Sequence, residues 1–428
     1  MSHTPQKIFM SGIGGIGMSG LAQLLVERGD RVTGSDREES PTTEMLTRKG
    51  VQVCIGQRPT NVPEDATLLV YSAAVHADNP ERMRASELGI PQLTYFDMLG
   101  EVAKGKRVVA ISGTNGKTTT TGMLGRILKD AGVSPAVVVG SIVKDFESNY
   151  LSGTSDLFVV EACEYERHFL SLSPDVLVVT NIELDHTDYY KDLADVQSAF
   201  RALMEKVPAT GFIVTDVESP TIAPLLQGLS ATIVDYKKEP AYTLRLPGAF
   251  NVENAKAAAS AARIVDTSVT EQIISSGLAD FHGSWRRFEY KGKTARGAEV
   301  YDDYGHHPTA IKGTLAALRE KSEGKVYVVF HPHLFSRTRD LFDDFGTAFS
   351  DADQVYIAPI YPAREVDDGT VSSELLAQRL RANGVSAEAL SFPEIQELLS
   401  SIPTEGDVIM TMGAGDIYKV ANAIVVDK

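Results

Sequence analysis

Short runs of apolar residues recur along the chain, and most are followed by glycine or by polar residues. Continuous apolar runs of this length, bounded by turn-forming residues, are typical of strands buried in a parallel sheet. Stretches with helical spacing lie between several of them, among others at 18–28, 119–131 and 255–263. This alternation predicts an α/β fold. The predicted strands are residues 7–11, 31–34, 67–71, 108–111, 156–160, 176–180, 300–302, 325–330 and 407–412.

A glycine-rich segment, G-T-N-G-K-T at residues 113–118, joins the strand at 108–111 to the helix at 119–131. Glycines let backbone N–H groups approach an anion, and a helix start adds partial positive charge. In such a loop Lys117 reaches the β- and γ-phosphates and the Thr118 hydroxyl holds Mg²⁺. The usual pattern has glycine where this chain has Ile111, so the loop is a shortened variant; a chance Gly-Lys-Thr on a surface turn is the alternative. The candidate nucleotide contacts are Gly113, Thr114, Asn115, Gly116, Lys117, Thr118 and Thr119.

A second glycine-rich segment, G-I-G-G-I-G at residues 12–17, lies between the strand at 7–11 and the helix at 18–28. An acid, Asp36, follows about 20 residues on, as in the dinucleotide-binding fingerprint. The pattern places a pyrophosphate on the helix start and does not say which nucleotide carries it; a tight turn without a ligand is the alternative. Ser72 ends a further strand that faces the same crevice. The candidate residues here are Gly14, Gly15, Ile16, Gly17, Asp36 and Ser72.

Polar side chains also follow two strands near the phosphate loop. Glu161 ends the strand at 156–160, and His186 lies shortly after the strand at 176–180. Ligands bind beyond the carboxyl ends of parallel strands, and Mg²⁺ prefers oxygen ligands while keeping several waters. One carboxylate with the ATP phosphates therefore suffices for a metal site made by Thr118, Glu161 and His186. An ordinary strand-end acid and a locally bonded histidine are the alternatives.

The rest of the chain offers adenine and anion contacts. Asn251 and Asn254 are spaced to share one helix face and could hydrogen-bond an adenine; helix N-capping by Asn251 is the alternative. Paired arginines suit planar carboxylate or phosphate groups, and a surface charge patch is the alternative. Such a pair, Arg337 and Arg339, follows the strand at 325–330. The adjacent pair His306 and His307 does not have the i, i+4 spacing of a helical zinc site.

Composition limits the possible partners. The chain has 428 residues, with 43% hydrophobic and 23% charged residues, as in soluble globular proteins of two to four domains. Its formal charge of −16, with no basic stripe, argues against nucleic acid. Two cysteines and the lack of a long apolar run predict a cytoplasmic protein that does not enter the membrane. We place domain boundaries to give units 1–105, 106–282 and 283–428.

Taken together, the motifs resemble the Mur ligases of peptidoglycan synthesis, along nearly the whole chain and in order. They are G-I-G-G-I-G-M-S-G at 12–20, G-T-N-G-K-T-T-T-T at 113–121, T-N-I-E-L-D-H at 180–186, L-P-G-x-x-N-x-x-N-A at 246–255, D-D-Y-G-H-H-P at 302–308 and S-R-T-R-D-L at 336–341. The resemblance implies a Rossmann-like UDP-binding domain, a central P-loop ATPase domain and a C-terminal Rossmann-like domain. It also implies ATP and Mg²⁺ as cofactors, and a cytoplasmic monomer or homodimer that joins L-alanine to UDP-N-acetylmuramate.

The resemblance assigns roles position by position. Gly14 to Gly17, Asp36 and Ser72 would hold the UDP moiety, and Lys117 and Thr118 the ATP phosphates and Mg²⁺. Glu161 and His186 match the family's metal ligands, and Asn251 and Asn254 its adenine contacts. The C-terminal domain would meet ATP through Arg287 and Asp303, and the acceptor through His306, His333, Arg337 and Arg339. The catalytic set implied is Lys117, His186, Arg287, His306 and Arg337.

This chain departs from the family branch at four places. Asn115 stands where the branch usually has histidine, and Phe250 where a histidine usually precedes Asn251. Ser284 and Trp285 replace a small residue and glycine, and Leu334 replaces an arginine. Three other functions remain possible at this level: a recycling ligase that joins a tripeptide to the same sugar nucleotide, a hydrolytic ATPase, and a nucleotide-gated switch without catalysis.

Overall fold

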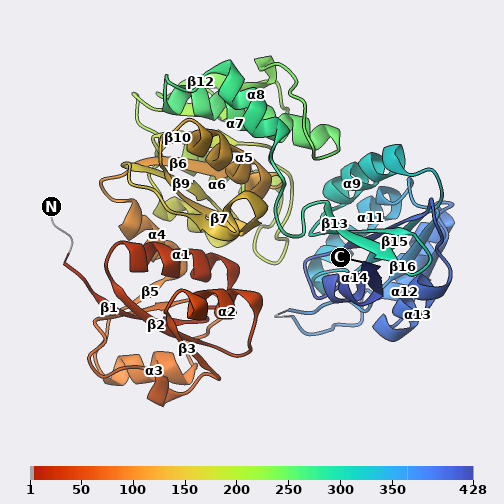
Figure 1. The fold of residues 1–428 in the computed structure, drawn as a ribbon, viewed down its shortest axis with the longest axis horizontal. Helices are drawn as coiled ribbons and strands as arrows, with labels where there is room; N and C mark the ends of the chain where they lie inside the picture. The colour runs from red at the N-terminus through yellow and green to blue at the C-terminus, as the bar shows by residue number, and fades with distance from the viewer. Residues whose placement is uncertain (1–3, 364, 428) are drawn as a thin grey trace.

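The computed structural model describes residues 4–363 and 365–427. Its strands form three separate sheets, which follow one another along the chain. In Figure 1 the N-terminal sheet (red) lies below the middle one (yellow to green), and the C-terminal sheet (blue) lies to their right. The predicted three-unit α/β fold is therefore confirmed. Among the described residues, every helix is too short or too polar to traverse a lipid bilayer.

The N-terminal sheet is wholly parallel, with the strand order β3-β2-β1-β4-β5. Its strands are β1 (Lys7–Ser11), β2 (Arg31–Asp36), β3 (Gln52–Ile55), β4 (Leu68–Tyr71) and β5 (Gln92–Thr94). Its helices are α1 (Ile16–Glu27), α2 (Pro41–Arg48), α3 (Pro80–Glu87) and α4 (Tyr95–Ala103), with a 3-10 turn η1 (Pro59–Asn61). The order reverses at β1, so the loops after β1 and β4 open a crevice at the carboxyl edge.

The middle sheet has the order β12-β11-β10-β6-β9-β7-β8, in which only the β7–β8 pair is antiparallel. Its strands are β6 (Arg107–Ser112), β7 (Ala136–Val143), β8 (Ser148–Leu151), β9 (Leu157–Glu161), β10 (Val176–Val179), β11 (Phe212–Thr215) and β12 (Thr232–Asp235). The α-helices are α5 (Lys117–Asp130), α6 (Leu193–Met204), α7 (Ala249–Val265) and α8 (Glu271–Ala279). Short 3-10 segments are η2 (Lys144–Phe146), η3 (Tyr165–Ser171), η4 (Ala223–Leu225) and η5 (Tyr236–Lys238).

The C-terminal sheet has the order β17-β16-β15-β18-β14-β13-β19, and β13 runs antiparallel to both of its neighbours. Its strands are β13 (Glu289–Thr294), β14 (Glu299–Asp303), β15 (Val326–Phe330), β16 (Gln354–Ile357), β17 (Ala387–Ala389), β18 (Val408–Met412) and β19 (Val425–Asp427). Its helices are α9 (Pro308–Lys321), α10 (Phe335–Asp340), α11 (Phe342–Ala348), α12 (Ser373–Ala382), α13 (Phe392–Ser401) and α14 (Tyr418–Ile424).

Helices begin earlier than the sequence predicts. The phosphate-loop helix α5 begins at Lys117 rather than at 119, and α7 begins at Ala249 rather than at 255. In both cases glycine with a positive φ precedes the helix, at Gly116 (86°) and Gly248 (96°). Glycine adopts this backbone without steric cost, so the chain turns into the helix at once. Gly248 is thus the N-cap of α7, which removes Asn251 from that alternative role.

The buried core shows which units are joined most firmly. One cluster of buried apolar side chains runs from β1 through the helices of the first unit into the middle unit, from Ile8 to Ala231. The C-terminal unit has cores of its own, with buried members from Phe288 to Ile424. Burial of apolar surface stabilises contact roughly in proportion to area. The first two units therefore share a hydrophobic core, whereas the cores of the third unit are separate.

The unit boundaries remain a proposal that fits this arrangement. We propose the divisions after residues 105 and 282 because each falls between two sheets. The first lies between the end of α4 at Ala103 and the start of β6 at Arg107. The second lies between the end of α8 at Ala279 and the start of β13 at Glu289.

Candidate active site

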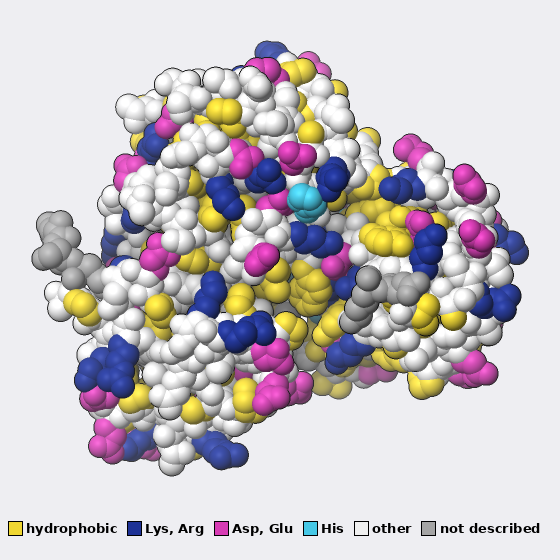
Figure 2. Space-filling model, in the orientation of Figure 1, with side chains coloured by type: hydrophobic (Ala, Val, Ile, Leu, Met, Phe, Trp, Pro, Cys, Tyr) yellow, Lys and Arg dark blue, Asp and Glu magenta, His cyan; other side chains and the backbone are white. Residues whose placement is uncertain are grey.

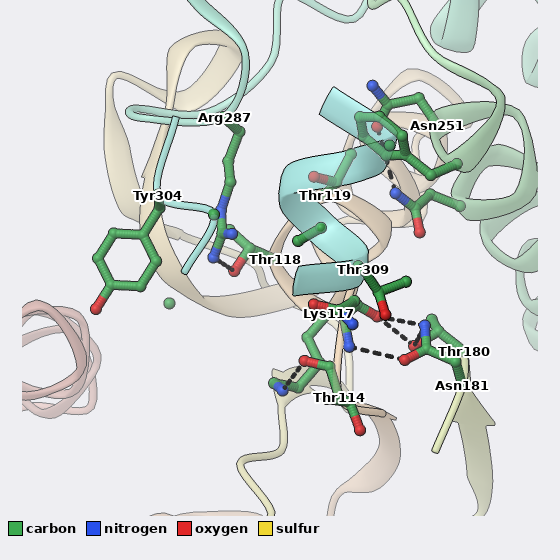
Figure 3. Close-up of a pocket in the computed structure, with 18 of the residues that line it drawn as sticks. Thr114, Lys117, Thr118, Thr119, Thr180, Asn181, Asn251, Arg287, Tyr304 and Thr309 are labelled. Carbon is green, nitrogen blue, oxygen red and sulfur yellow. Dashed lines mark hydrogen bonds between the residues drawn. The ribbon is translucent and has the colours of Figure 1, made fainter. Parts of the chain in front are cut away.

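A cavity of about 800 Å³ lies where the middle and C-terminal units meet, and Ile16 of the first unit reaches its wall. Figure 3 shows Thr114, Lys117, Thr118 and Thr119 of the middle unit together with Arg287, Tyr304 and Thr309 of the C-terminal unit. On the face shown in Figure 2, Lys and Arg side chains and a histidine gather over this boundary. The predicted residues that line the cavity are Ile16, Thr114, Asn115, Gly116, Lys117, Thr118, Thr119, Glu161, His186, Asn251, Asn254, Arg287, Asp303 and His306.

The Lys117 ammonium lies inside the phosphate loop. It donates to the carbonyl oxygens of Gly113 and Thr114 and to the carboxylate of Glu164, 2.9 Å from Oε2. Burial would lower the pKa of Lys117, but the charge and hydrogen bond of Glu164, together with neighbouring acidic groups such as Glu161, raise the pKa overall. Glu164 itself is only 2% exposed. The site thus keeps a fully charged lysine at the place where a phosphate chain would enter.

The neighbouring Thr118 provides the second element of the loop. Its hydroxyl donates to Glu161 Oε1 at 2.9 Å, and Glu161 Oε2 accepts from the Gly140 amide at 2.6 Å. A Cβ at Gly140 would lie 2.6 Å from the Glu161 carboxylate, so only glycine leaves room for it. Arg287 of the C-terminal unit donates to Thr118 Oγ1 at 3.1 Å, as Figure 3 shows. A hydroxyl and a carboxylate side by side are oxygen ligands of the kind that Mg²⁺ takes.

His186 lies on the far side of Glu164. Its Nε2 is 3.8 Å from Glu164 Oε1 and 4.0 Å from Asp185 Oδ2, and its ring lies 4.8 Å from that of Tyr165. Its backbone φ is +52°, an uncommon value for a residue with a side chain. Such strain is tolerated where surrounding contacts hold the residue in place. The structure therefore brings His186 into the cavity, beside Glu164.

The two predicted adenine contacts lie together behind the loop. Asn251 donates to the carbonyl of Pro247 at 2.7 Å, and Asn254 donates to Asn251 Oδ1 at 3.3 Å. Asn254 Oδ1 lies only 2.2 Å from the position that a Cβ on Gly116 would take. Gly116 therefore needs its positive φ and its missing side chain for the helix α7 to approach the phosphate loop.

Asp303 is predicted to contact ATP, and its carboxylate is already bonded to the backbone. It accepts from the amides of Phe288 at 2.7 Å and Gly305 at 2.6 Å. Burial raises the pKa of Asp303, while Arg287 and the two amides oppose that shift. Asp303 thus holds the segment after Arg287 and the turn before His306 in place.

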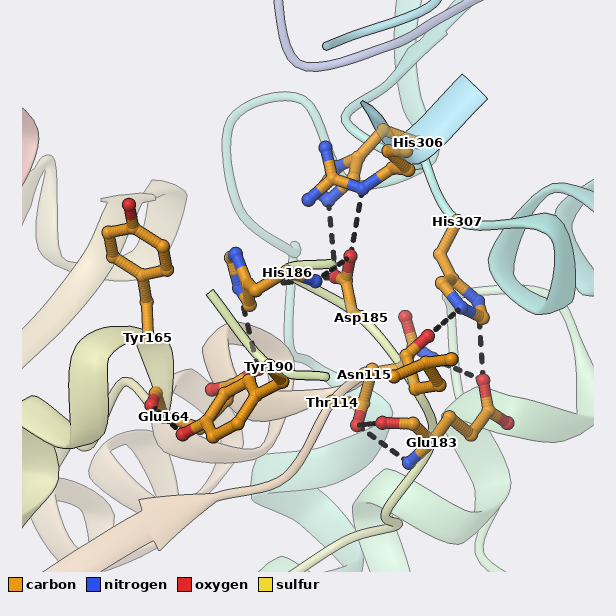
Figure 4. A network of polar contacts seen from close by, with 12 residues as sticks. Thr114, Asn115, Glu164, Tyr165, Glu183, Asp185, His186, Tyr190, His306 and His307 are labelled. Atoms are coloured by element: carbon orange, nitrogen blue, oxygen red, sulfur yellow. Dashed lines mark hydrogen bonds and ion pairs between the residues drawn. The ribbon is translucent and has the colours of Figure 1, made fainter. Parts of the chain in front are cut away.

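A second group of predicted residues surrounds a carboxylate that the sequence analysis did not single out, Asp185. Arg337 donates to Asp185 Oδ1 at 2.8 Å, and His306 Nε2 lies 3.8 Å from Oδ2 (Figure 4). Burial would raise the pKa of Asp185, but Arg337 and the nearby histidines hold it well below its usual range. Burial and the charge of Arg337 lower the pKa of His306 to about 4, so its imidazole is neutral at pH 7.

The remaining acceptor-side residues differ in exposure. Arg337 is 3% exposed and also contacts the His333 ring at 3.2 Å. Arg339 lies on the surface, where it pairs with Asp340 and Asp368. Leu334, at the position of the family's arginine, is buried and has a φ of +73°. His333, Arg337 and Arg339 are not among the residues that line the 800 Å³ cavity.

The residues predicted to hold the UDP moiety lie around the glycine loop of the first unit. The Gly14 amide donates to Asp36 Oδ2 at 2.8 Å, and the Ser72 amide donates to the carbonyl of Ser11 at 3.1 Å. A Cβ at Gly17 would lie 2.8 Å from the Tyr95 ring, so glycine there lets α4 approach. The predicted residues thus meet at the carboxyl ends of β1, β2 and β4. Of them, only Ile16 lines the larger cavity.

Arg286, the neighbour of Arg287, anchors the linker to the C-terminal unit. It is 2% exposed and donates to Asp302 Oδ2 at 2.7 Å and to the carbonyls of Gly413 and Gly415.

We expect Arg286→Ala to lower the free energy of unfolding by about 3–5 kcal/mol, because it leaves the carboxylate of Asp302 buried without its cation. Urea denaturation measures this change. The control is Arg296→Ala, at an exposed arginine, which should change the free energy of unfolding by less than about 0.5 kcal/mol. If Arg286→Ala has an effect as small as that of Arg296→Ala, the expectation is refuted.

Three carboxylates in this region were missed as site residues: Glu164, Glu183 and Asp185. All three follow strand ends, in segments whose neighbours were selected from the sequence. Ligands bind beyond the carboxyl ends of parallel strands, so the positions of these carboxylates after β9 and β10 could have identified them from the sequence. Which cation each one faces depends on contacts between segments far apart in the chain, so the sequence could not supply the pairs.

Three family models match the chain in succession. They are described as "Mur ligase family, catalytic domain" for residues 7–107, "Mur ligase middle domain" for 111–240 and "Mur ligase, glutamate ligase domain" for 286–415. Each model matches one of the three sheets, and only β19 and part of β6 lie outside the matched residues.

Relatives with known names match over almost the full length. A UDP-N-acetylmuramate–L-alanine ligase of Clostridium kluyveri is 38% identical, covering 97% of each chain. That of Clostridium novyi is 39% identical, covering 97% of this chain and 96% of the relative. The crystal structure of the Thermotoga maritima UDP-N-acetylmuramate-alanine ligase is similar with a TM-score of 0.80 at 28% identity, covering 98% of each chain. A murein peptide ligase of Psychrobacter arcticus shares the fold, with a TM-score of 0.74 at 23% identity over 99% of this chain and 100% of that one. With matches of this extent to sequence and fold alike, the chain belongs to the Mur ligase family.

Proposed function

We propose that this protein joins L-alanine to the carboxylate of UDP-N-acetylmuramate, with ATP driving the reaction through an acyl phosphate. The observation that carries the proposal is the convergence of Lys117, Thr118 and Glu161 with Arg287 in one cavity between two units. Relatives named for this activity are 38–39% identical along the whole chain, which supports the same substrates. A structure named for the tripeptide-joining alternative, a UDP-N-acetylmuramate:L-alanyl-γ-D-glutamyl-meso-diaminopimelate ligase of Neisseria, is only 25% identical and covers 66% of this chain, so that alternative has less support.

The first chemical step requires positioning and charge neutralisation. A carboxylate is a poor electrophile, and transfer of the γ-phosphoryl group converts it into a reactive acyl phosphate. Lys117 would exchange its contact with Glu164 for the β- and γ-phosphates, and Arg287 would face the same group from the C-terminal unit. Thr118, Glu161 and His186 would hold Mg²⁺, which supplies further positive charge when bound.

The second step is attack of the amine of alanine on the acyl carbon. The attack forms a tetrahedral oxyanion, which the cations already placed for phosphoryl transfer can stabilise. Its collapse breaks the bond between the acyl carbon and the phosphate oxygen, which gives the amide and releases inorganic phosphate. The amine must lose a proton before it attacks. His306 has an unprotonated imidazole at pH 7, and its lowered pKa makes it a weak base; His333, beside Arg337, is the second candidate base.

The substrates would enter from three sides. We assign the UDP moiety to Gly14 through Gly17, Asp36 and Ser72, and the adenine to Asn251 and Asn254. Asp303 serves this site by holding the linker that carries Arg287. His333, Arg337 and Arg339 are assigned to the acceptor carboxylate, with Arg337 oriented by Asp185.

The proposed location is the cytoplasm. Cys54 and Cys163 are free thiols, which fits a reducing compartment.

The amino acid preference tests the proposal. We expect L-alanine to be the best acceptor, with glycine and L-serine weaker by only about 10–200-fold, because one methyl or hydroxyl group is worth about 1–3 kcal/mol in a small pocket. D-alanine should be worse, since a clamp on its carboxylate would turn its methyl group into the wall. Phosphate release with ATP, UDP-N-acetylmuramate and each acceptor measures the order.

The same assay separates the alternatives. Phosphate release that needs both other substrates supports a ligase, whereas release without them supports a hydrolytic ATPase. No release under any condition supports a nucleotide-gated switch. Faster ligation of L-Ala-D-Glu-diaminopimelate than of L-alanine at equal concentration would replace our proposal with the recycling reaction.

A further inference from the structure

We propose that Glu183 is a positioning residue that joins the phosphate loop to the C-terminal unit through His307. The inference rests on the proposed function, since it concerns how the two halves of that site are held together. Glu183 lies in the loop after β10 and its side chain is 31% exposed at the cavity wall. Figure 4 shows it between Thr114 and Asn115 on one side and His307 on the other.

On the side of the phosphate loop, Glu183 is bonded through both backbone and side chain. Its amide donates to Thr114 Oγ1 at 2.9 Å, and its carbonyl accepts from the same hydroxyl at 3.3 Å. Its carboxylate accepts from Asn115 Nδ2 at 3.3 Å. Asn115 is in turn held by Asn181, which accepts from the Asn115 amide at 2.9 Å. Glu183 is therefore hydrogen-bonded through its backbone and its side chain to the phosphate loop, which carries Lys117 and Thr118.

On the other side the partner is His307, the N-cap of α9. Its Nδ1 lies 3.2 Å from Glu183 Oε2, and its Nε2 lies 3.1 Å from the carbonyl oxygen of Leu184. The Thr309 amide donates to Nδ1 at 3.4 Å. The imidazole therefore contacts two consecutive residues of the loop after β10, Glu183 and Leu184, while it caps α9. With a side chain only 8% exposed, His307 makes this polar contact across the unit boundary away from solvent.

The position of this contact gives it a consequence for the reaction. The apolar cores of the C-terminal unit are separate from the core shared by the other two, so polar contacts such as this one largely set how it sits on the phosphate loop. In this arrangement Arg287 of the C-terminal unit donates to Thr118 of the middle unit, so a change in how the units sit would move Arg287 relative to the phosphate loop. Glu183 thus acts on phosphoryl transfer through the placement of Arg287 and does not itself need to touch ATP.

Two substitutions break the contact with little other change. Glu183→Gln keeps an acceptor for Asn115 but loses the charge, and His307→Asn keeps a good N-cap for α9. We expect each to lower kcat by roughly 5–150-fold, the usual range for coupling between sites, and to leave the KM for UDP-N-acetylmuramate unchanged. The double variant should lose no more than the single ones, since both remove one interaction.

Small-angle X-ray scattering with ADP and UDP-N-acetylmuramate provides a readout without turnover. Both variants should have a larger radius of gyration than the unchanged protein under these conditions. Asp195→Asn is the matched control, because Asp195 has a 28% exposed carboxylate paired with Arg167 inside one unit. It should change neither kcat nor the radius of gyration, and thermal unfolding shows whether each variant is folded.

The outcomes distinguish this inference from the proposed function. Losses in the double variant that equal the product of the single losses, or an unchanged radius of gyration in both single variants, would overturn the role of Glu183. If the unchanged protein ligates no alanine while its compaction still depends on Glu183, the proposed function fails and the link between the units stands.

Discussion

Lys117→Ala should reduce ligation by about 10³-fold or more, the scale expected when a charge that stabilises a transition state is removed. The physical reason is that this ammonium lies within the phosphate loop. Residues 113–118 contain no other Lys or Arg that could replace its positive charge. Binding of UDP-N-acetylmuramate should remain nearly intact, because its proposed contacts lie at β1, β2 and β4 of another unit. Phosphate release measures the first effect and calorimetric titration the second.

Two controls make the result interpretable. Lys129→Ala removes an exposed lysine from the last turn of the same helix and should leave the rate unchanged. The Lys117→Ala variant also leaves the Glu164 carboxylate buried without its cation, which is destabilising by itself. Combining Lys117→Ala with Glu164→Gln relieves that charge, and the double variant should be folded and inactive. Equal loss of ligation and of UDP-sugar binding would refute the assignment of Lys117.

Glu161→Gln should lower kcat by about 10²-fold or more and raise the Mg²⁺ concentration needed for half-maximal rate. Glutamine keeps the shape and still accepts from Thr118 or from the Gly140 amide, but it removes the negative charge. Titration of the rate with Mg²⁺, together with Mn²⁺ binding followed by electron paramagnetic resonance without substrate turnover, measures the effect.

The comparison for this variant is Glu271→Gln, a surface carboxylate of the same unit that pairs with Arg263. We expect no change in metal dependence there. If Glu161→Gln has the same metal dependence as the unchanged protein, Glu161 is a strand-end acid that holds Gly140 and Thr118, and the metal lies elsewhere.

Much of the local structure follows from the sequence because its causes are local. Apolar runs between turn residues predicted β1, β4, β6, β9, β10, β14, β15 and β18 to within about two residues. The two glycine-rich segments predicted two tight loops, each between a strand and a helix, since positive φ and close backbone approach are properties of glycine itself. The family motifs along the chain indicated three α/β units, which the sheets confirm.

Tertiary structure decided how charges are paired. Glu164 with Lys117, Asp185 with Arg337, and Glu183 with His307 each join residues at least 47 positions apart. A carboxylate at a strand end meets whichever cation the folded chain brings to it, and sequence spacing carries no information about that meeting. The division into two units with a common core and a third with its own cores has the same origin. The sequence by itself determined where the two glycine-rich loops lie between a strand and a helix. Only the packing of three units determined which side chains surround those loops, because that packing depends on contacts between distant segments.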